Sequence, residues 1–141
     1  MIVAVLDTNV LVSGVLGFRR ESSVPGELLW SWLRNEFAVA LSDHVMFGNG
    51  TLLGIALGGT NANAHDASVV MSQLEKRTRY DPTPHLIPGI ATHPEDDLVI
   101  ATALAADADA LVTGDGGLLR VGAFAGISIM SPQAFLAVLQ P

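Results

Sequence analysis

The chain has 141 residues, of which half are hydrophobic and 15% are charged, and we expect residues 1–141 to form a single folded domain. The absence of cysteine excludes disulfides, zinc–thiolate sites and cysteine nucleophiles. The formal net charge is −7 with only seven Lys and Arg residues, which argues against tight binding of nucleic acid by a basic surface alone. Oxygen ligands remain available, and they favour hard divalent ions such as Mg²⁺ or Mn²⁺.

The first half of the chain shows strand-like and helix-like patterns in turn. The unbroken apolar run at residues 2–6 is rich in β-branched side chains and predicts a buried parallel strand. Val24–Arg34 predicts a helix, because its apolar residues fall at helical spacing and Pro25 suits the first turn. Phe37–Leu41 predicts a second strand, followed by Ser42 as the N-cap of a helix.

The middle of the chain is dominated by glycine and proline. Gly48–Thr60 contains five glycines among apolar residues, and each one weakens a helix by about 1 kcal/mol relative to alanine. Asn63–Thr78 has a regular apolar stripe and predicts a helix. Tyr80–Pro88 holds three prolines and predicts an extended crossover loop.

The second half returns to alternating elements. Pro94–Ala106 predicts a helix with acidic residues in its first turn, and Ala110–Thr113 predicts the strand that follows it. Gly116–Val121 is long enough for one helical turn, Ile127–Met130 predicts another strand, and Ser131 with Pro132 begins a last helix. Strands that alternate with helices indicate an α/β fold whose parallel sheet is covered on both faces.

Acidic residues stand at three ends of the predicted elements. Asp7 ends the first strand, Asp115 follows the third, and Asp96 and Asp97 lie in the first turn of the helix before it. Each one taken separately is most simply a helix cap or a turn residue. Together they favour a site, because ligands of open α/β sheets bind at the carboxyl ends of the strands. Crowded carboxylates repel one another, and a divalent cation relieves that repulsion.

Four segments resemble the PIN-domain family, including the VapC-like toxins of toxin–antitoxin pairs. V-L-D-T-N-V-L-V-S-G at Val5–Gly14 is similar to the opening of these domains, and H-P-E-D-D-L-V-I-A-T-A-L at His93–Leu104 is similar to their second signature. L-V-T-G-D at Leu111–Asp115 resembles the third signature, and S-P-Q-A-F-L at Ser131–Leu136 resembles the last helix. The resemblance covers nearly the whole chain in the right order.

The resemblance implies a three-layer α/β/α sandwich with a central, mainly parallel sheet of four or five strands. It implies an endoribonuclease that cleaves single-stranded RNA with Mg²⁺ or Mn²⁺. The implied partners are the RNA substrate and a cognate antitoxin protein, with a homodimer left open. The implied site residues are the metal ligands Asp7, Asp96 and Asp115, with Asp97 as the close substitute for Asp96, Asn9 as a polar support and Thr113 beside Asp115.

One departure from the family pattern concerns catalysis. PIN domains usually carry a glutamate on the helix after the second strand, and here that position falls at or beside Gly48, in the acid-free segment M-F-G-N-G-T. Asp43 is the nearest carboxylate and lies close to the expected helix start. We therefore expect a weakened endoribonuclease, and the alternative is a catalytically inactive PIN-fold module that binds a protein partner.

The amino-terminal sequence differs from a signal peptide, because it has no basic start and its apolar run ends at Asp7. No stretch approaches the roughly 20 apolar residues that span a bilayer. The sequence therefore predicts a cytoplasmic protein that does not enter a membrane.

Overall fold

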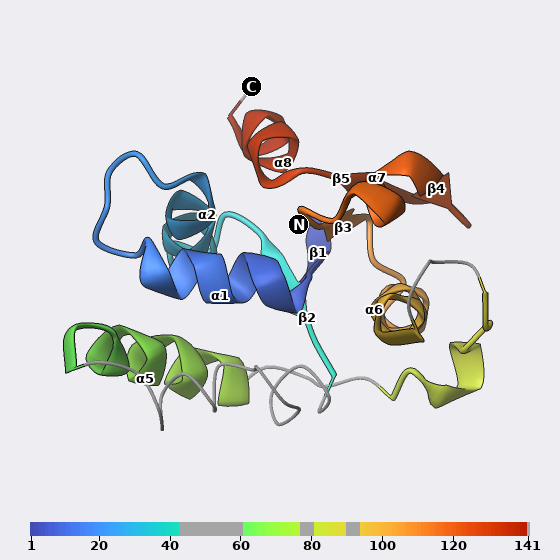
Figure 1. Ribbon diagram of the computed structural model, residues 1–141, viewed down its shortest axis with the longest axis horizontal. Coiled ribbons are helices and arrows are strands. Elements are labelled where there is room, and N and C mark those ends of the chain that lie inside the picture. Colours follow the sequence, from blue (N-terminus) through green and yellow to red (C-terminus); the bar gives the residue numbers. More distant parts are fainter. Residues whose placement is uncertain (43–60, 77–80, 90–93, 141) are drawn as a thin grey trace.

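Three layers make up the fold, with helices on both faces of one central sheet (Figure 1). The computed structural model describes residues 1–42, 61–76, 81–89 and 94–140. The glycine-rich segment 48–60 and the helix expected after Ser42 lie outside these residues. The α/β/α architecture predicted from the sequence is confirmed.

The sheet has five strands in the order β2-β1-β3-β5-β4, of which the first four are parallel and β4 pairs antiparallel with β5. The strands are β1 (Val3–Leu6), β2 (Ala38–Ala40), β3 (Ala110–Val112), β4 (Ala123–Phe124) and β5 (Ile127–Met130). The sequence did not predict β4, which is two residues long. It is joined to β5 through Ala125 and Gly126, whose φ angles of 51° and 84° are those of a tight hairpin turn.

The helices form two sets, one on each face of the sheet. Successive side chains of a strand point to opposite faces, so each strand contributes to the core on both sides. Ala4 and Leu6 of β1 join the core beneath one set, while Val5 joins the core beneath the other. The first set is α1 (Thr8–Leu16), α2 (Val24–Leu33), α5 (Asn61–Glu75) and α8 (Pro132–Leu139). The second set is α6 (Pro94–Ala105) and α7 (Gly116–Val121).

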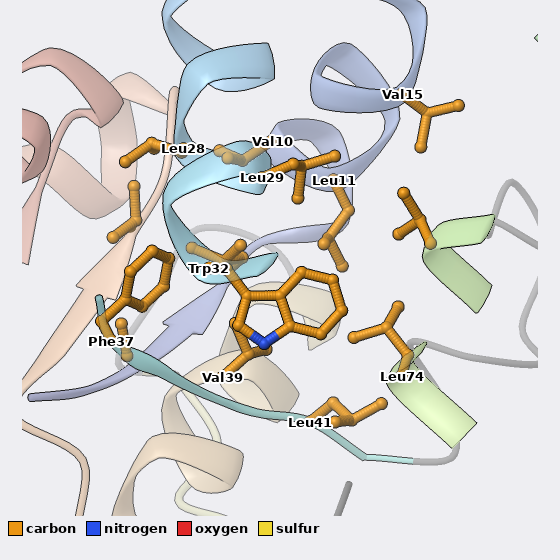
Figure 2. Packing of buried hydrophobic residues seen from close by; sticks show 14 of the residues in the cluster. Val10, Leu11, Val15, Leu28, Leu29, Trp32, Phe37, Val39, Leu41 and Leu74 are labelled. Carbon is orange, nitrogen blue, oxygen red and sulfur yellow. The ribbon is translucent and has the colours of Figure 1, made fainter. Parts of the chain in front are cut away.

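The larger core is built around the indole of Trp32. Figure 2 shows this ring among Leu11 of α1, Leu74 of α5 and Leu41, which follows β2. Trp32 is only 1% exposed, and it is the largest fully buried side chain among the described residues. Three helices and the edge of the sheet therefore share one apolar centre, and burial of each such side chain contributes about 1.5–3 kcal/mol.

The predicted helices α2, α6 and α8 are confirmed to within one residue at each described end. Side chains cap two of them, because Ser23 Oγ accepts from Gly26 N and Ser131 Oγ accepts from Ala134 N, both at 3.1 Å. The predicted turn at Gly116–Val121 is also confirmed, as α7. In the described part of the chain, no helix is both long and apolar enough to cross a bilayer.

Two local structures differ from the sequence-based expectation. Helix α1 was not predicted, although its buried residues Val10, Leu11, Gly14 and Val15 fall at helical spacing. The segment expected to be an extended loop contains a short 3-10 helix, η1 (Thr83–His85). A hydrogen bond of 2.9 Å from Thr83 N to Asp81 Oδ1 begins that turn, so the prolines do not keep the whole segment extended.

Helices α1 and α2 approach each other closely at glycines. A β-carbon on Gly26 would overlap the backbone carbonyl of Gly17, and one on Gly14 would lie 2.7 Å from Leu29 Cδ1. The close crossing of α1 and α2 therefore requires glycine at these two positions, because any larger side chain would collide with the other helix or the connection between them. It matters for the site because α1 begins directly after Asp7.

We predict that Gly26→Ala destabilises the fold by about 1–2 kcal/mol net, because the obstructing backbone carbonyl cannot rotate away and puts the cost in the upper part of the usual range of about 1–3 kcal/mol for overpacking. The gain in helix propensity, about 1 kcal/mol, is too small to reverse the sign. Gly116→Ala is the matched control, since its new β-carbon would meet only Arg120 Nη1, at 3.7 Å. Urea unfolding should lower the midpoint for Gly26→Ala alone. Equal midpoints for the two variants would show that the crossing tolerates a methyl group.

Candidate functional site

The carboxyl ends of β1 and β3 bring Asp7 and Thr113 together. These neighbouring parallel strands are in a register that sets Leu6 opposite Val112, so the next pair is Asp7 and Thr113. Asp7 N donates to Val112 O at 2.9 Å and Thr113 N donates to Met130 O at 3.0 Å, which extends the sheet pattern by one residue on each strand. Both side chains are buried, with Asp7 6% and Thr113 0% exposed.

The Thr113 hydroxyl links the two acidic positions at this edge. Thr113 Oγ1 donates to Asp7 Oδ2 at 2.8 Å and accepts from Asp115 N at 3.0 Å. A hydroxyl has one proton, so the bond to Asp7 uses it and fixes the orientation of the group. Asp7 occupies the N-cap position of α1, yet its side chain makes no capping bond there. Thr113, directly after β3, thus helps to hold the carboxylate of Asp7.

Asp115 is the N-cap of α7, as its position in a turn suggested. Its Oδ2 accepts from Leu118 N at 2.9 Å, and the residue is half-buried. This bond uses one oxygen of a group that has two oxygens and about four lone pairs. Capping of α7 and ligation of a cation by Asp115 are therefore compatible.

Asp96 and Asp97 are the third and fourth residues of α6, which packs against β1 and β3. A short connection joins α6 to β3, so the helix runs antiparallel to that strand and its first turn lies toward the carboxyl ends of the sheet. Asp97 is 6% exposed, and its Oδ2 accepts from Gly89 N at 3.0 Å. This bond ties Gly89, in the segment before α6, to the first turn of that helix. The sequence did not predict this structural role of Asp97.

The remaining predicted positions are simpler to place. Asn9 is the second residue of α1 and is exposed to solvent. Gly48 and Asp43, which concern the missing acid, lie outside the described residues. Asp96 is half-buried in the first turn of α6.

The oxygen donors at the strand ends suit a hard divalent cation. Carboxylate and hydroxyl oxygens are the ligands that Mg²⁺ and Mn²⁺ prefer, and Asp7, Thr113 and Asp115 supply them in one hydrogen-bonded group. Within the described part of the chain, no three Asp, Glu or His side chains are grouped closely enough to hold a metal ion. The chemistry of the donors fits the ion, and two of the three predicted carboxylates lie at neighbouring strand ends.

We predict that Thr113→Val lowers the free energy of unfolding by about 1.5–3 kcal/mol, because it removes a buried hydrogen bond to a charged group. Thr113→Ser keeps the hydroxyl and loses one methyl group, so it should cost only about 0.8 kcal/mol. Urea unfolding at neutral pH measures both variants. Losses of equal size would mean that the hydroxyl contributes no more than the methyl group.

Comparison with known families covers most of this architecture. A family model described as PIN domain matches residues 3–116, from β1 to the start of α7, and this range includes every predicted site residue. A search of curated proteins finds no match. Because the match spans well over half of the chain, the protein belongs to the PIN-domain family.

Proposed function

We propose that this PIN domain is a Mg²⁺- or Mn²⁺-dependent endoribonuclease that cleaves single-stranded RNA as the toxin of a toxin–antitoxin pair. PIN domains are generally nucleases and typically use divalent metals, so the family supports the reaction class. The observation that carries the proposal is the buried hydrogen bond from Thr113 to Asp7 at the carboxyl ends of β1 and β3. It holds an acidic side chain in a fixed orientation where α/β folds bind ligands.

The proposed direct ligands of the ion are Asp7 and Asp115. Asp96, with Asp97 as its substitute, is proposed to reach the ion through bound water, because the described residues hold no group of three such side chains close enough to bind an ion directly. Bound there, Mg²⁺ or Mn²⁺ supplies Lewis acidity toward a phosphodiester. Thr113 positions the Asp7 carboxylate, and burial keeps bulk water away from it. Asn9, exposed on the first turn of α1, is proposed to support the polar edge of the site.

The proposed macromolecular partners are the RNA substrate and a cognate antitoxin protein, with a homodimer left open.

The second candidate function is a catalytically inactive PIN-fold module that binds a protein partner. Two observations favour it. The sequence has no acid at or beside Gly48, and the described residues contain no three acidic or histidine side chains placed closely enough to hold a metal ion. A site with too few negative ligands holds a divalent ion poorly.

We predict that cleavage of a fluorescent single-stranded RNA is slow, requires Mn²⁺ or Mg²⁺, and falls at least about a hundredfold in Asp7→Asn. Loss of a residue that only supports a metal ligand typically costs 10–100-fold, and loss of a ligand should cost no less. Asp107→Asn is the matched control, because Asp107 is exposed and its φ of 51° suits asparagine. Equal rates for Asp7→Asn and the wild type would remove Asp7 from the site.

The same assay separates the two candidate functions through Gly48→Glu. If the missing acid limits catalysis, glutamate should raise the metal-dependent rate, while Gly48→Gln, which adds a similar side chain without charge, should not. The gain should disappear when Asp7→Asn is combined with Gly48→Glu. No gain from Gly48→Glu, together with no cleavage by the wild type, would leave the partner-binding module as the better account.

A further inference from the structure

We propose that a cleft at the far end of α1 binds one nucleotide of a single-stranded RNA, with the base against Trp30 and the phosphate at Arg20. The inference rests on the proposed function and names a second contact for the same substrate. The cleft has a volume of about 340 Å³ and is lined by residues 18–21, which follow α1, and by Glu27, Trp30 and Arg34 of α2. Sites for small ligands begin at about 300 Å³, so one nucleotide is a suitable occupant.

A fixed aromatic surface forms one wall of the cleft. The rings of Phe18 and Trp30 stack with centroids 4.3 Å apart and an angle of 12° between their planes. Trp30 Nε1 donates to Phe18 O at 2.7 Å, which holds the indole in place. Phe18 is 4% exposed, whereas Trp30 is 39% exposed although the stack covers one of its faces. The indole therefore keeps part of its ring open to solvent in a fixed position, which is what a stacking base requires.

Three arginines lie around this aromatic surface. Three of the chain's seven Lys and Arg residues line the cleft, namely Arg19, Arg20 and Arg34, in a protein whose net charge is −7. Two of them are held by carboxylates, because Arg19 lies 3.2 Å from Asp66 and Arg34 lies 2.7 Å from Glu36.

Arg20 is the cation that the proposal assigns to the phosphate. It is exposed, and among the described residues it forms no ion pair. Glu21 and Glu27 also line the cleft, and Glu27 Oε1 accepts a hydrogen bond from Gln140 Nε2 at 3.3 Å. Because Arg19 and Arg34 are already paired with Asp66 and Glu36, Arg20 is the arginine of the cleft left for a phosphate. We therefore expect the affinity to depend on stacking together with one phosphate contact.

The position of the cleft relative to Asp7 suits an RNA strand that is bound at both places. Helix α1 begins directly after Asp7 and ends just before the cleft, as Figure 1 shows for α1 and the connection to α2. Its nine residues span about 14 Å at 1.5 Å per residue. A stacked strand with about 3.4 Å per nucleotide covers that length in about four nucleotides. One RNA strand can thus reach both places, which gives the cleft a use in the proposed reaction.

The test is fluorescence anisotropy of a short labelled oligouridine with the full-length protein in EDTA, where metal-dependent cleavage is silent. Trp30→Leu should weaken binding on the order of tenfold, which is the scale of one lost base stack, while Trp30→Phe should retain most of the affinity. Arg20→Gln should weaken binding and flatten its salt dependence by about 0.7 in the log–log slope, the value for one lost phosphate contact. Lys76→Gln removes the same charge from the end of α5 and should leave binding unchanged.

Several outcomes would overturn the inference. Equal affinities for the wild type, Trp30→Leu and Arg20→Gln would show that the cleft does not touch RNA. An effect of Lys76→Gln as large as that of Arg20→Gln would indicate diffuse attraction and no site. Displacement of the RNA by an acidic peptide but not by uridine monophosphate would assign the cleft to a protein segment. Since the assay contains no metal, failure of the catalytic proposal leaves its result intact, and an active enzyme whose binding ignores Trp30 would contradict this inference alone.

Discussion

Pairing of β1 with β3 in one register is the constraint on which the site depends. At the amino ends Asp109 N donates to Val3 O and Asp109 Oδ2 accepts from Val3 N, both at 2.8 Å. Asp109 therefore binds both the backbone N–H and the backbone carbonyl of Val3, the first residue of β1. At the carboxyl ends Asp7 N bonds to Val112 O. A slip of one residue would reverse the faces of all side chains on β1, exchanging the cores and separating Asp7 from Thr113.

Much of this frame could be predicted from the sequence, because short apolar runs and helical spacing are local signals. Asp7 and Asp115 were expected at strand ends for that reason. The bond from Thr113 to Asp7 could not be derived, since it depends on β1 and β3 being neighbours, which no local pattern states. Helix α1 was missed because valine and glycine are poor helix formers, and its packing against α2 overrides that preference.

A chain with a net charge of −7 can still bind an anionic substrate, because its charges are unevenly distributed. The acidic groups at the strand ends suit a cation, which would reverse the local charge toward phosphate. Three arginines line the cleft at the other end of α1, beside the partly exposed Trp30. The glycines where α1 crosses α2 hold these two regions in a fixed relation, because neither helix can shift without breaking that close contact.

The central claim is that Asp7, held by Thr113, is a ligand of a divalent cation. Isothermal titration calorimetry with Mn²⁺ tests it without any assumption about RNA or catalysis. We expect weak binding heats from the wild-type protein and from Asp107→Asn, and loss of those heats in Asp7→Asn. Equal heats from the wild type and Asp7→Asn would contradict the claim, because the buried carboxylate would then take no part in metal binding.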